Sequence, residues 1–251
     1  MDQLPNLGRE QEMLDIMGVS SMKDLFEDIP VEIRSEGTLP LPPPQTEEEI
    51  LRDAERLLGA NVNLDSRPSF ISAGLARNFV PSMVPMIATR GEFLTSYTPY
   101  QPEVSQGMLQ AMWEFQTMIS ELVGLPISNV SMYDASTSAA EAITCAVRVK
   151  SKKVEMPNTV YVSELVPPHR MSVIENYTQG VGIEIRKIPH DEDGFLDLNL
   201  AAEASGSCAI YVEQPNAFGI LDEGLLRLRE VVGDKTAIIV GVDVTSLGIV
   251  E

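Results

Sequence analysis

The stretch "TVYVSELVPPHRMSVIENYTQGVGIEIRKI", residues 159–188, decides the fold class. It opens with a short run rich in valine and tyrosine, passes through a segment of helical character that starts at two prolines, and closes on a run rich in isoleucine. A strand, a helix and a strand in this order form a βαβ unit, in which the two strands lie parallel. The stretch therefore predicts a parallel sheet covered by helices.

The same alternation continues on both sides of that stretch. Short apolar runs at 129–133, 208–213 and 237–243 have the valine and isoleucine content of strands. Segments with helical patterns lie between the runs, at residues 139–151, 167–180, 196–205 and 224–233. Together these patterns predict an α/β domain with a mostly parallel sheet flanked by helices.

A long helix is predicted ahead of the strands, over residues 104–123. Its apolar residues recur at three- and four-residue steps, and Gly124 and Pro126 end it. Because neighbours such as Leu109 and Trp113 are apolar as well, we expect this helix to be buried on more than one side.

The first 65 residues have a different character. Short helical segments at 9–17 and 20–29 lead into a proline-rich connector, and Thr46 then opens a helix with a capping-box glutamate three residues later. These elements offer too little apolar surface to fold alone. We therefore expect residues 1–65 to form an N-terminal helical arm on an α/β large domain, residues 66–251.

The charge of the chain limits its partners. Its net charge is −19, which would be repelled by phosphate backbones and anionic headgroups, so neither nucleic acid nor a membrane surface is expected as a partner. No apolar window reaches membrane-spanning length, and the N-terminus lacks the features of a secretory signal. We expect a cytoplasmic protein, in which a disulfide between Cys145 and Cys208 would be unusual.

Several common catalytic signatures are absent from the sequence. The two histidines and two cysteines show no metal-ligand spacing, so no metal site is expected. The chain also contains no phosphate-binding P-loop, no nucleophile elbow and no dinucleotide-binding fingerprint. Candidate functional residues must therefore come from polar segments at the ends of strands, where ligands bind in parallel α/β sheets.

The first such segment is "YDASTSAAEA", residues 133–142, which follows a predicted strand and opens a helix. Ser136 and Thr137 would place hydroxyls beside free backbone N–H groups at a helix N-terminus, where an anion is stabilised. Alternatively, Ser138 and Glu141 form a capping box, which a helix needs without any ligand. The residues by themselves leave both interpretations open.

Two further segments end strands. Asn216, in "EQPNAFG" (213–219), belongs either to a polar binding turn or to a plain loop. Asp243 ends a very apolar strand, where a carboxylate is costly unless it has a partner. It either holds the protonated ring nitrogen of a pyridine cofactor or caps the turn that follows.

The segment "SYTPYQPEVSQG", residues 96–107, concentrates hydrogen-bonding side chains on a stiffened backbone. Its two prolines fix φ and push the residues before them into extended conformations, so little entropy is lost when the side chains are presented. The side chains concerned are those of Tyr97, Thr98, Tyr100 and Gln101. They form either a preorganised polar edge with a function or a rigid turn whose tyrosines pack in the core.

These motifs carry a resemblance that covers nearly the whole chain. The run "SYTPYQPEVSQGMLQAMWEFQTMISELVGLPISNVSMYDASTSAAEA", together with "LPLPPPQTEEEIL" and "QPNAFGILDE", closely resembles the glycine decarboxylases, the P-proteins of the glycine cleavage system. The match is to the first subunit of the form that is split into two subunits. That subunit usually continues well beyond the position of Glu251, so the chain is expected to be truncated or shortened.

The resemblance implies the fold of type I pyridoxal-phosphate enzymes and a part in glycine dehydrogenase (aminomethyl-transferring) activity. It implies decarboxylation of glycine with transfer of the aminomethyl group to the lipoyl arm of the H-protein. The pyridoxal phosphate would be held mainly by subunit 2, which bears the cofactor lysine, and this chain would contribute no catalytic residue. The expected pocket residues here are Tyr97, Thr98, Tyr100, Gln101, Ser136, Thr137, Asn216 and Asp243.

Departures from the family pattern keep an alternative open. Ala135 stands where the family usually has glycine, and Leu75 and Asn78 stand near its usual aromatic and histidine positions. The alternative is a non-catalytic scaffold that stabilises a partner subunit. An independent pyridoxal-phosphate enzyme would need a lysine soon after the aspartate strand, and no lysine follows Asp243.

Overall fold

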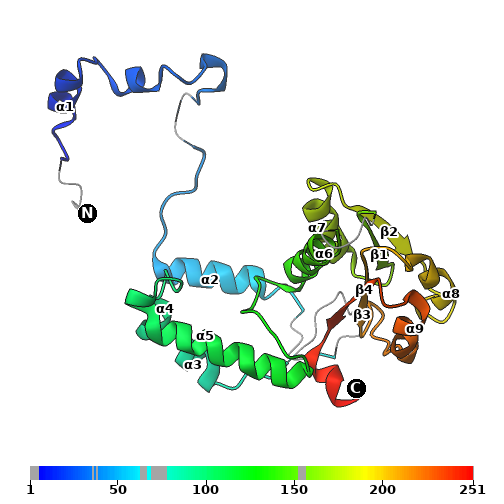
Figure 1. Ribbon diagram of the computed structural model, residues 1–251. Coiled ribbons are helices and arrows are strands. Elements are labelled where there is room, and N and C mark those ends of the chain that lie inside the picture. Colours follow the sequence, from blue (N-terminus) through cyan, green and yellow to red (C-terminus); the bar gives the residue numbers. More distant parts are fainter. Residues whose placement is uncertain are drawn as a thin grey trace. The chain divides into compact units, whose positions relative to one another are not determined.

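The computed structural model describes residues 6–35, 37, 39–62, 67–68, 78–151 and 157–250. The chain divides into two compact units, Met1–Arg67 and Pro68–Glu251. Each unit is described by itself below (Figure 1). The predicted division into an arm and a large domain at residue 65 stays a prediction.

The first unit consists of short helices: α1 (Glu10–Met17), the 3-10 helices η1 (Met22–Phe26) and η2 (Val31–Ile33), and α2 (Glu47–Leu58). The predicted capping box of α2 is confirmed, because the Glu49 carboxylate accepts from the Thr46 backbone N–H at 2.8 Å and the Thr46 hydroxyl accepts from the Glu49 N–H. Gly18 ends α1 in the left-handed conformation, with φ 73°. Leu14 is the single buried apolar residue in the described part of this unit, so its elements have little core of their own.

The second unit contains the predicted parallel sheet. Its strands are β1 (Thr159–Ser163), β2 (Glu184–Ile188), β3 (Ala209–Gln214) and β4 (Ala237–Val242). They lie in the order β2-β1-β3-β4, and every neighbouring pair is parallel. Four of the five predicted strands are thus confirmed, and the prediction from 159–188 of a βαβ unit is correct.

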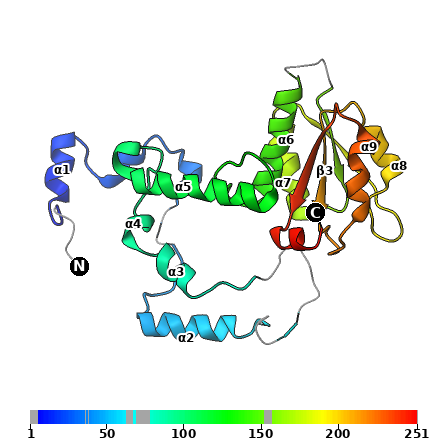
Figure 2. The same ribbon diagram turned by 60° about the horizontal axis from the view of Figure 1, so that its bottom comes forward.

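Helices cover both faces of the sheet (Figure 2). On one face lie α6 (Ala135–Ser151) and α7 (Pro168–Gln179), and on the other lie α8 (Leu198–Ala201), the 3-10 helices η3 (Ala202–Ala204) and η4 (Glu223–Arg227), and α9 (Leu228–Val232). Side chains alternate between the two layers as the strand pleat requires: Val160 and Val162 pack on the α6–α7 side, and Tyr161 packs on the other. All five residues of β1 are buried, which explains why its sequence is a continuous apolar run rather than an alternating one.

The predicted strand at 129–133 is wrong, because residues 127–132 have no regular secondary structure. Its sequence has strand propensity, but Val130 is partly exposed and Tyr133 is almost fully exposed. A strand also needs a neighbour that accepts its backbone hydrogen bonds, and this segment pairs with none of the four described strands. The helix after it, α6, therefore follows an irregular segment rather than a strand.

The long helix α5 (Pro102–Val123) forms as predicted and ends at Gly124 with φ 68°. The prediction that it is buried on more than one side is wrong for the chain by itself: the exposed fractions are 70% for Trp113 and 59% for Leu122. Two shorter helices, α3 (Met83–Ala88) and α4 (Gly91–Leu94), precede it and were not predicted. No helix among the described residues is long and apolar enough to cross a bilayer.

Candidate functional site

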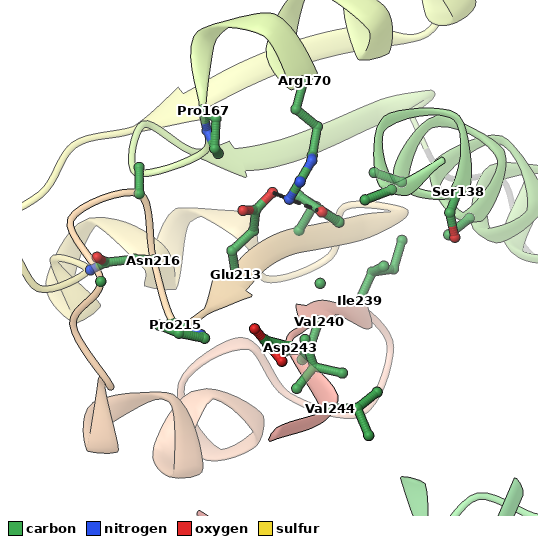
Figure 3. Close-up of a pocket in the computed structure, with 18 of the residues that line it drawn as sticks. Ser138, Pro167, Arg170, Glu213, Pro215, Asn216, Ile239, Val240, Asp243 and Val244 are labelled. Atoms are coloured by element: carbon green, nitrogen blue, oxygen red, sulfur yellow. Dashed lines mark hydrogen bonds and ion pairs between the residues drawn. The ribbon is translucent and has the colours of Figure 1, made fainter. Parts of the chain in front are cut away.

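A cavity of about 800 Å³ lies beyond the carboxyl ends of β3 and β4 (Figure 3). Residues from those strands, from the loops after them and from the first turns of α6 and α7 line it. This is the edge of the sheet at which parallel α/β proteins bind ligands, because the loops that leave the strands converge there. Two of the predicted site residues, Asn216 and Asp243, line this cavity.

A buried ion pair lines the cavity. Arg170, in the first turn of α7, points at Glu213 on β3, with 2.5 Å between its Nη1 and Glu213 Oε1 (Figure 3). The side chains are 11% and 6% exposed. The Tyr211 hydroxyl donates to the same Oε1 at 3.0 Å. The sidechains of Arg170, Glu213 and Tyr211, hereafter the inner network, thus connect α7 to the sheet.

Burial controls the ionisation of the inner network. Burial raises the pKa of Glu213, and the hydrogen bond and charge of Arg170 only partly offset this. Burial also raises the pKa of Tyr211, with the nearby Glu213 charge acting in the same direction. Both shifts follow from the low dielectric of the cavity floor, which disfavours the charged form of each acid.

Gly241 on β4 makes room for the inner network. A Cβ at this position would collide with the Tyr211 hydroxyl oxygen and would come within 3.2 Å of Glu213 Cγ. Glycine is therefore required here by close approach and not by an unusual backbone conformation. The Nε of Arg170 is buried and has no hydrogen-bond partner among the described residues.

Sequence analysis missed the inner network. Glu213 could have been found by the reasoning that singled out Asp243, since it is a carboxylate at the end of an apolar strand. Arg170 carries no comparable signal, because a basic residue near the start of a helix is ordinarily solvated. Only the placement of α7 on the face of the sheet that carries Tyr211 and Glu213 brings the two charges together.

Asp243 and Asn216 serve the loops that carry them. Asp243 Oδ1 accepts from the backbone N–H and the hydroxyl of Thr245, at 3.0 and 2.6 Å, and so caps the 3-10 helix η5 (Val244–Gly248). Asn216 is buried, accepts from the N–H groups of Phe218 and Ile220, and donates to the Gly194 carbonyl. The capping and loop interpretations are thus observed, while cofactor contacts by either residue stay predictions.

The N-terminus of α6 is capped by a residue that sequence analysis did not choose. Asp134 Oδ1 accepts from the Thr137 N–H at 2.7 Å, and the Thr137 hydroxyl accepts from the Asp134 N–H at 3.2 Å. The predicted capping box at Ser138 is therefore wrong, because the helix begins at Ala135, four residues earlier than predicted. The backbone hydrogen bond from Thr137 lowers the pKa of Asp134, so a carboxylate already holds the position proposed for an anion.

The polar edge of Tyr97, Thr98, Tyr100 and Gln101 lies apart from the cavity lining. It forms a turn held from within, in which the Thr98 carbonyl accepts from the Gln101 N–H at 3.1 Å and from the Ser105 hydroxyl at 3.2 Å. The exposed fractions are 93% for Tyr97 and 73% for Tyr100. The alternative that these tyrosines pack in the core of this chain is therefore wrong.

Of the residues that depart from the family pattern, Ala135 and Asn78 line the cavity. Leu75 lies outside the described residues. Ser136 and Thr137 do not line the cavity. Among the described residues, no group of three acidic, histidine or cysteine side chains could hold a metal ion.

The parallel sheet, its helical layers and the cavity at its carboxyl edge define the class of protein. The chain shares its fold with a NifS-like protein (TM-score 0.51, 12% identity, 68% of this chain and 47% of that one) and with mouse CSAD (TM-score 0.52, 15% identity, 87% and 48%). This is the large-domain fold of the type I pyridoxal-phosphate-dependent transferases.

Within that class, the chain belongs to the glycine cleavage system P-protein family, whose model matches residues 5–251. A crystal structure of glycine decarboxylase (P-protein) in inhibitor-bound form is 36% identical, with a TM-score of 0.75 over 100% of this chain and 55% of that one. Probable glycine dehydrogenase (decarboxylating) subunit 1 of Thermococcus onnurineus is 44% identical over 250 residues, and that of Saccharolobus solfataricus is 40% identical over 255. Each alignment covers 99% of this chain, which spans about half of the relatives' length, 54% and 55%.

The cavity of this chain does not fit the cofactor of its fold class. No lysine stands among the described residues that line it. The one cationic residue in the described lining, Arg170, is already paired with Glu213. At the α6 N-terminus, where a phosphate would be stabilised, the Asp134 carboxylate accepts the backbone N–H and adds negative charge.

Proposed function

We propose that this chain acts as subunit 1 of a glycine decarboxylase, in a complex that decarboxylates glycine and transfers the aminomethyl group to the lipoyl arm of the H-protein. The observation that carries the proposal is the family match over residues 5–251, with a glycine decarboxylase structure that superposes on the whole chain. Because the relatives are about twice as long, this activity belongs to the complete subunit and its partner. A cytoplasmic location is consistent with two free cysteine thiols.

The pyridoxal phosphate of the complex is held by a lysine-bearing second subunit. The printed name of the relatives, subunit 1, supports the existence of such a partner. The lack of fit between the cofactor and this chain's own cavity supports its assignment to the partner. When bound there, the cofactor supplies the electron sink that decarboxylation needs.

The contribution of this chain to chemistry is positional. The edge Tyr97–Gln101 faces the partner's cofactor pocket and helps to orient glycine or the aminomethyl product. Its turn is held by its own hydrogen bonds, so its side chains need little reorganisation when they meet a ligand. Exposure of both tyrosines leaves their hydroxyls accessible to a partner.

Reconstitution tests the proposal. The chain, in its full-length subunit, is mixed with the second subunit and lipoylated H-protein, and exchange of the glycine carboxyl with labelled bicarbonate is measured. Exchange is expected only when all three proteins are present. If the second subunit with H-protein reaches the same rate without this chain, the proposal is wrong.

A non-catalytic scaffold is the second candidate, favoured by Ala135 and by the inner network, which pairs Arg170 of the cavity lining with Glu213. A scaffold would raise the thermal stability of the second subunit. Turnover of the complex would then not depend on the tyrosine hydroxyls of the edge. The Tyr97→Phe and Tyr100→Phe variants described below distinguish the two functions.

A further inference from the structure

The outward side of α5 has a distinct chemical pattern. Glu114 and Glu121 are seven residues apart, two helical turns, so they lie on the same side of the helix. Trp113 lies on one flank of this pair, and Met118 and Leu122 lie on the other. We call these five residues the α5 outer face; its apolar members are exposed by 70% (Trp113), 54% (Met118) and 59% (Leu122), and both glutamates are exposed.

Nothing in the described part of the second unit neutralises this face. Glu114 accepts a hydrogen bond from the Gln110 amide at 2.9 Å, and neither glutamate has an ion pair among the described residues of that unit. The opposite side of α5 is where the chain packs on itself: Phe115 and Ile119 face the segment 128–138, and the Gln116 amide donates to the Ser128 carbonyl at 2.7 Å. Three large apolar side chains beside two carboxylates thus remain exposed in the second unit.

We propose that the α5 outer face is the docking surface for the second subunit, and that the partner meets it with an apolar surface carrying lysine or arginine. This inference rests on the proposed function, which supplies the partner. Exposed tryptophan and methionine side chains are enriched at protein interfaces, and charged side chains are found at the polar rim of such interfaces. The edge Tyr97–Gln101 immediately precedes α5 in the chain.

The negative charge of the α5 outer face favours the second subunit as its partner over a second copy of the chain and over the first 67 residues. A second copy of the chain carries the same net charge of −19, and a symmetric contact between two outer faces would bring carboxylates against carboxylates. The first 67 residues hold fifteen acidic and six basic residues, so their net charge has the same sign. A partner with basic residues at the contact complements Glu114 and Glu121.

Charge reversal provides the test. In the full-length subunit, Glu114→Lys/Glu121→Lys is compared with Glu203→Lys/Glu230→Lys, which makes the same change in net charge at exposed positions on η3 and α9. Affinity for the purified second subunit is measured by titration, and folding is checked by circular dichroism. The outer-face variant is expected to bind at least about tenfold more weakly, whereas the control stays within about twofold of the wild type.

A label on Trp113 reports contact at the face itself. Trp113 is the only tryptophan of the chain as given, so a subunit biosynthetically labelled with 5-fluorotryptophan, with any tryptophan beyond residue 251 replaced by phenylalanine, gives a fluorine signal from this position. The signal is expected to move when the second subunit is added, and its exposure to a soluble paramagnetic quencher should fall.

The outcomes separate the surface from the function. If the wild type binds the partner and both charge variants bind equally well, the surface is wrong and the proposed function stands. If the wild type does not bind the second subunit, both are wrong. A Trp113 signal already protected in the subunit alone, or protected by self-association, would assign the face to another part of the subunit or to a second copy, and would overturn the inference.

Discussion

The inner network and the edge Tyr97–Gln101 are both polar, and they differ in where their hydrogen bonds go. Arg170, Glu213 and Tyr211 are buried and bond to one another inside the chain. Tyr97 and Tyr100 stand almost free of the chain on a turn that is held by backbone and serine hydrogen bonds. A buried polar group must be paired to be tolerated, whereas a stiff exposed one has no structural requirement to meet. We infer that the network serves the fold and the edge serves a ligand or partner.

The largest expected effect comes from breaking the inner network. Arg170→Met should lower the free energy of unfolding by about 3–5 kcal/mol, because it leaves the Glu213 charge buried without a partner. Denaturant unfolding of the isolated chain measures this. Arg148→Met, at an exposed arginine of α6, is the control and should change stability by less than about 0.5 kcal/mol. If Arg170→Met and Arg148→Met have the same free energy of unfolding, the inner network does not stabilise the fold.

Removing the tyrosine hydroxyls of the edge should lower turnover and leave stability almost unchanged, the reverse of what is expected for the inner network. Tyr97→Phe and Tyr100→Phe should each lower turnover of the reconstituted complex by about tenfold to a thousandfold, roughly 1.4–4 kcal/mol, while the melting temperature barely moves. The reason is that a preorganised donor acts on the reacting groups and contributes little to folding. Tyr177→Phe, on α7, is the matched control for turnover. Unchanged turnover in both edge variants would leave the stretch as a stiff turn.

A smaller effect is expected from filling the space beside the network. Gly241→Ala places a methyl group against the Tyr211 hydroxyl and should cost about 1–3 kcal/mol of stability. Gly107→Ala is the control, because nothing lies within 4 Å of its Cβ and α5 gains a better helix former, which should add up to about 1 kcal/mol. Thermal unfolding of the two variants should therefore shift in opposite directions. An unchanged melting temperature of Gly241→Ala would mean that the Tyr211 side chain moves away from the new methyl group without cost.

The smallest effect concerns pH. Burial already holds the pKa of Glu213 above its ordinary value of 4.5, and Arg170→Met removes the charge that lowers it. In the variant the pKa of Glu213 should thus rise further, so protonation restores stability. The deficit of Arg170→Met against the wild type should be small at acidic pH and should grow as pH rises through the raised pKa, by on the order of 1 kcal/mol per pH unit. A deficit that does not depend on pH would show that the lost packing of the arginine, and not the charge of Glu213, explains the destabilisation.

Much of the fold was predictable from the sequence because the signals are local. The strands at 159–163 and 237–242 are compact runs of β-branched residues, and Thr46 and Gly18 fix helix ends through neighbours a few positions away. The local pattern at residues 129–133 gave a wrong prediction because a strand also needs a neighbouring strand, which the local pattern does not show. The run at 129–133 has strand composition without a strand to pair with among the described strands. The cap of α6 is a different case, because Asp134 and Thr137 are three residues apart and form a local pair that sequence analysis overlooked.

The sequence by itself determined the class of fold, the order of the four strands β1–β4 with the helices between them, and the stiff polar turn at Tyr97–Gln101, since periodicity, caps and prolines act over a few residues. Only the tertiary structure decided what the carboxyl edge of the sheet contains. The pairing of Arg170 with Glu213 depends on the placement of α7 on one face of the sheet, and the requirement for Gly241 depends on the register of β4 against β3. Such contacts join residues far apart in the chain, so their energies come from packing and burial that no local pattern encodes.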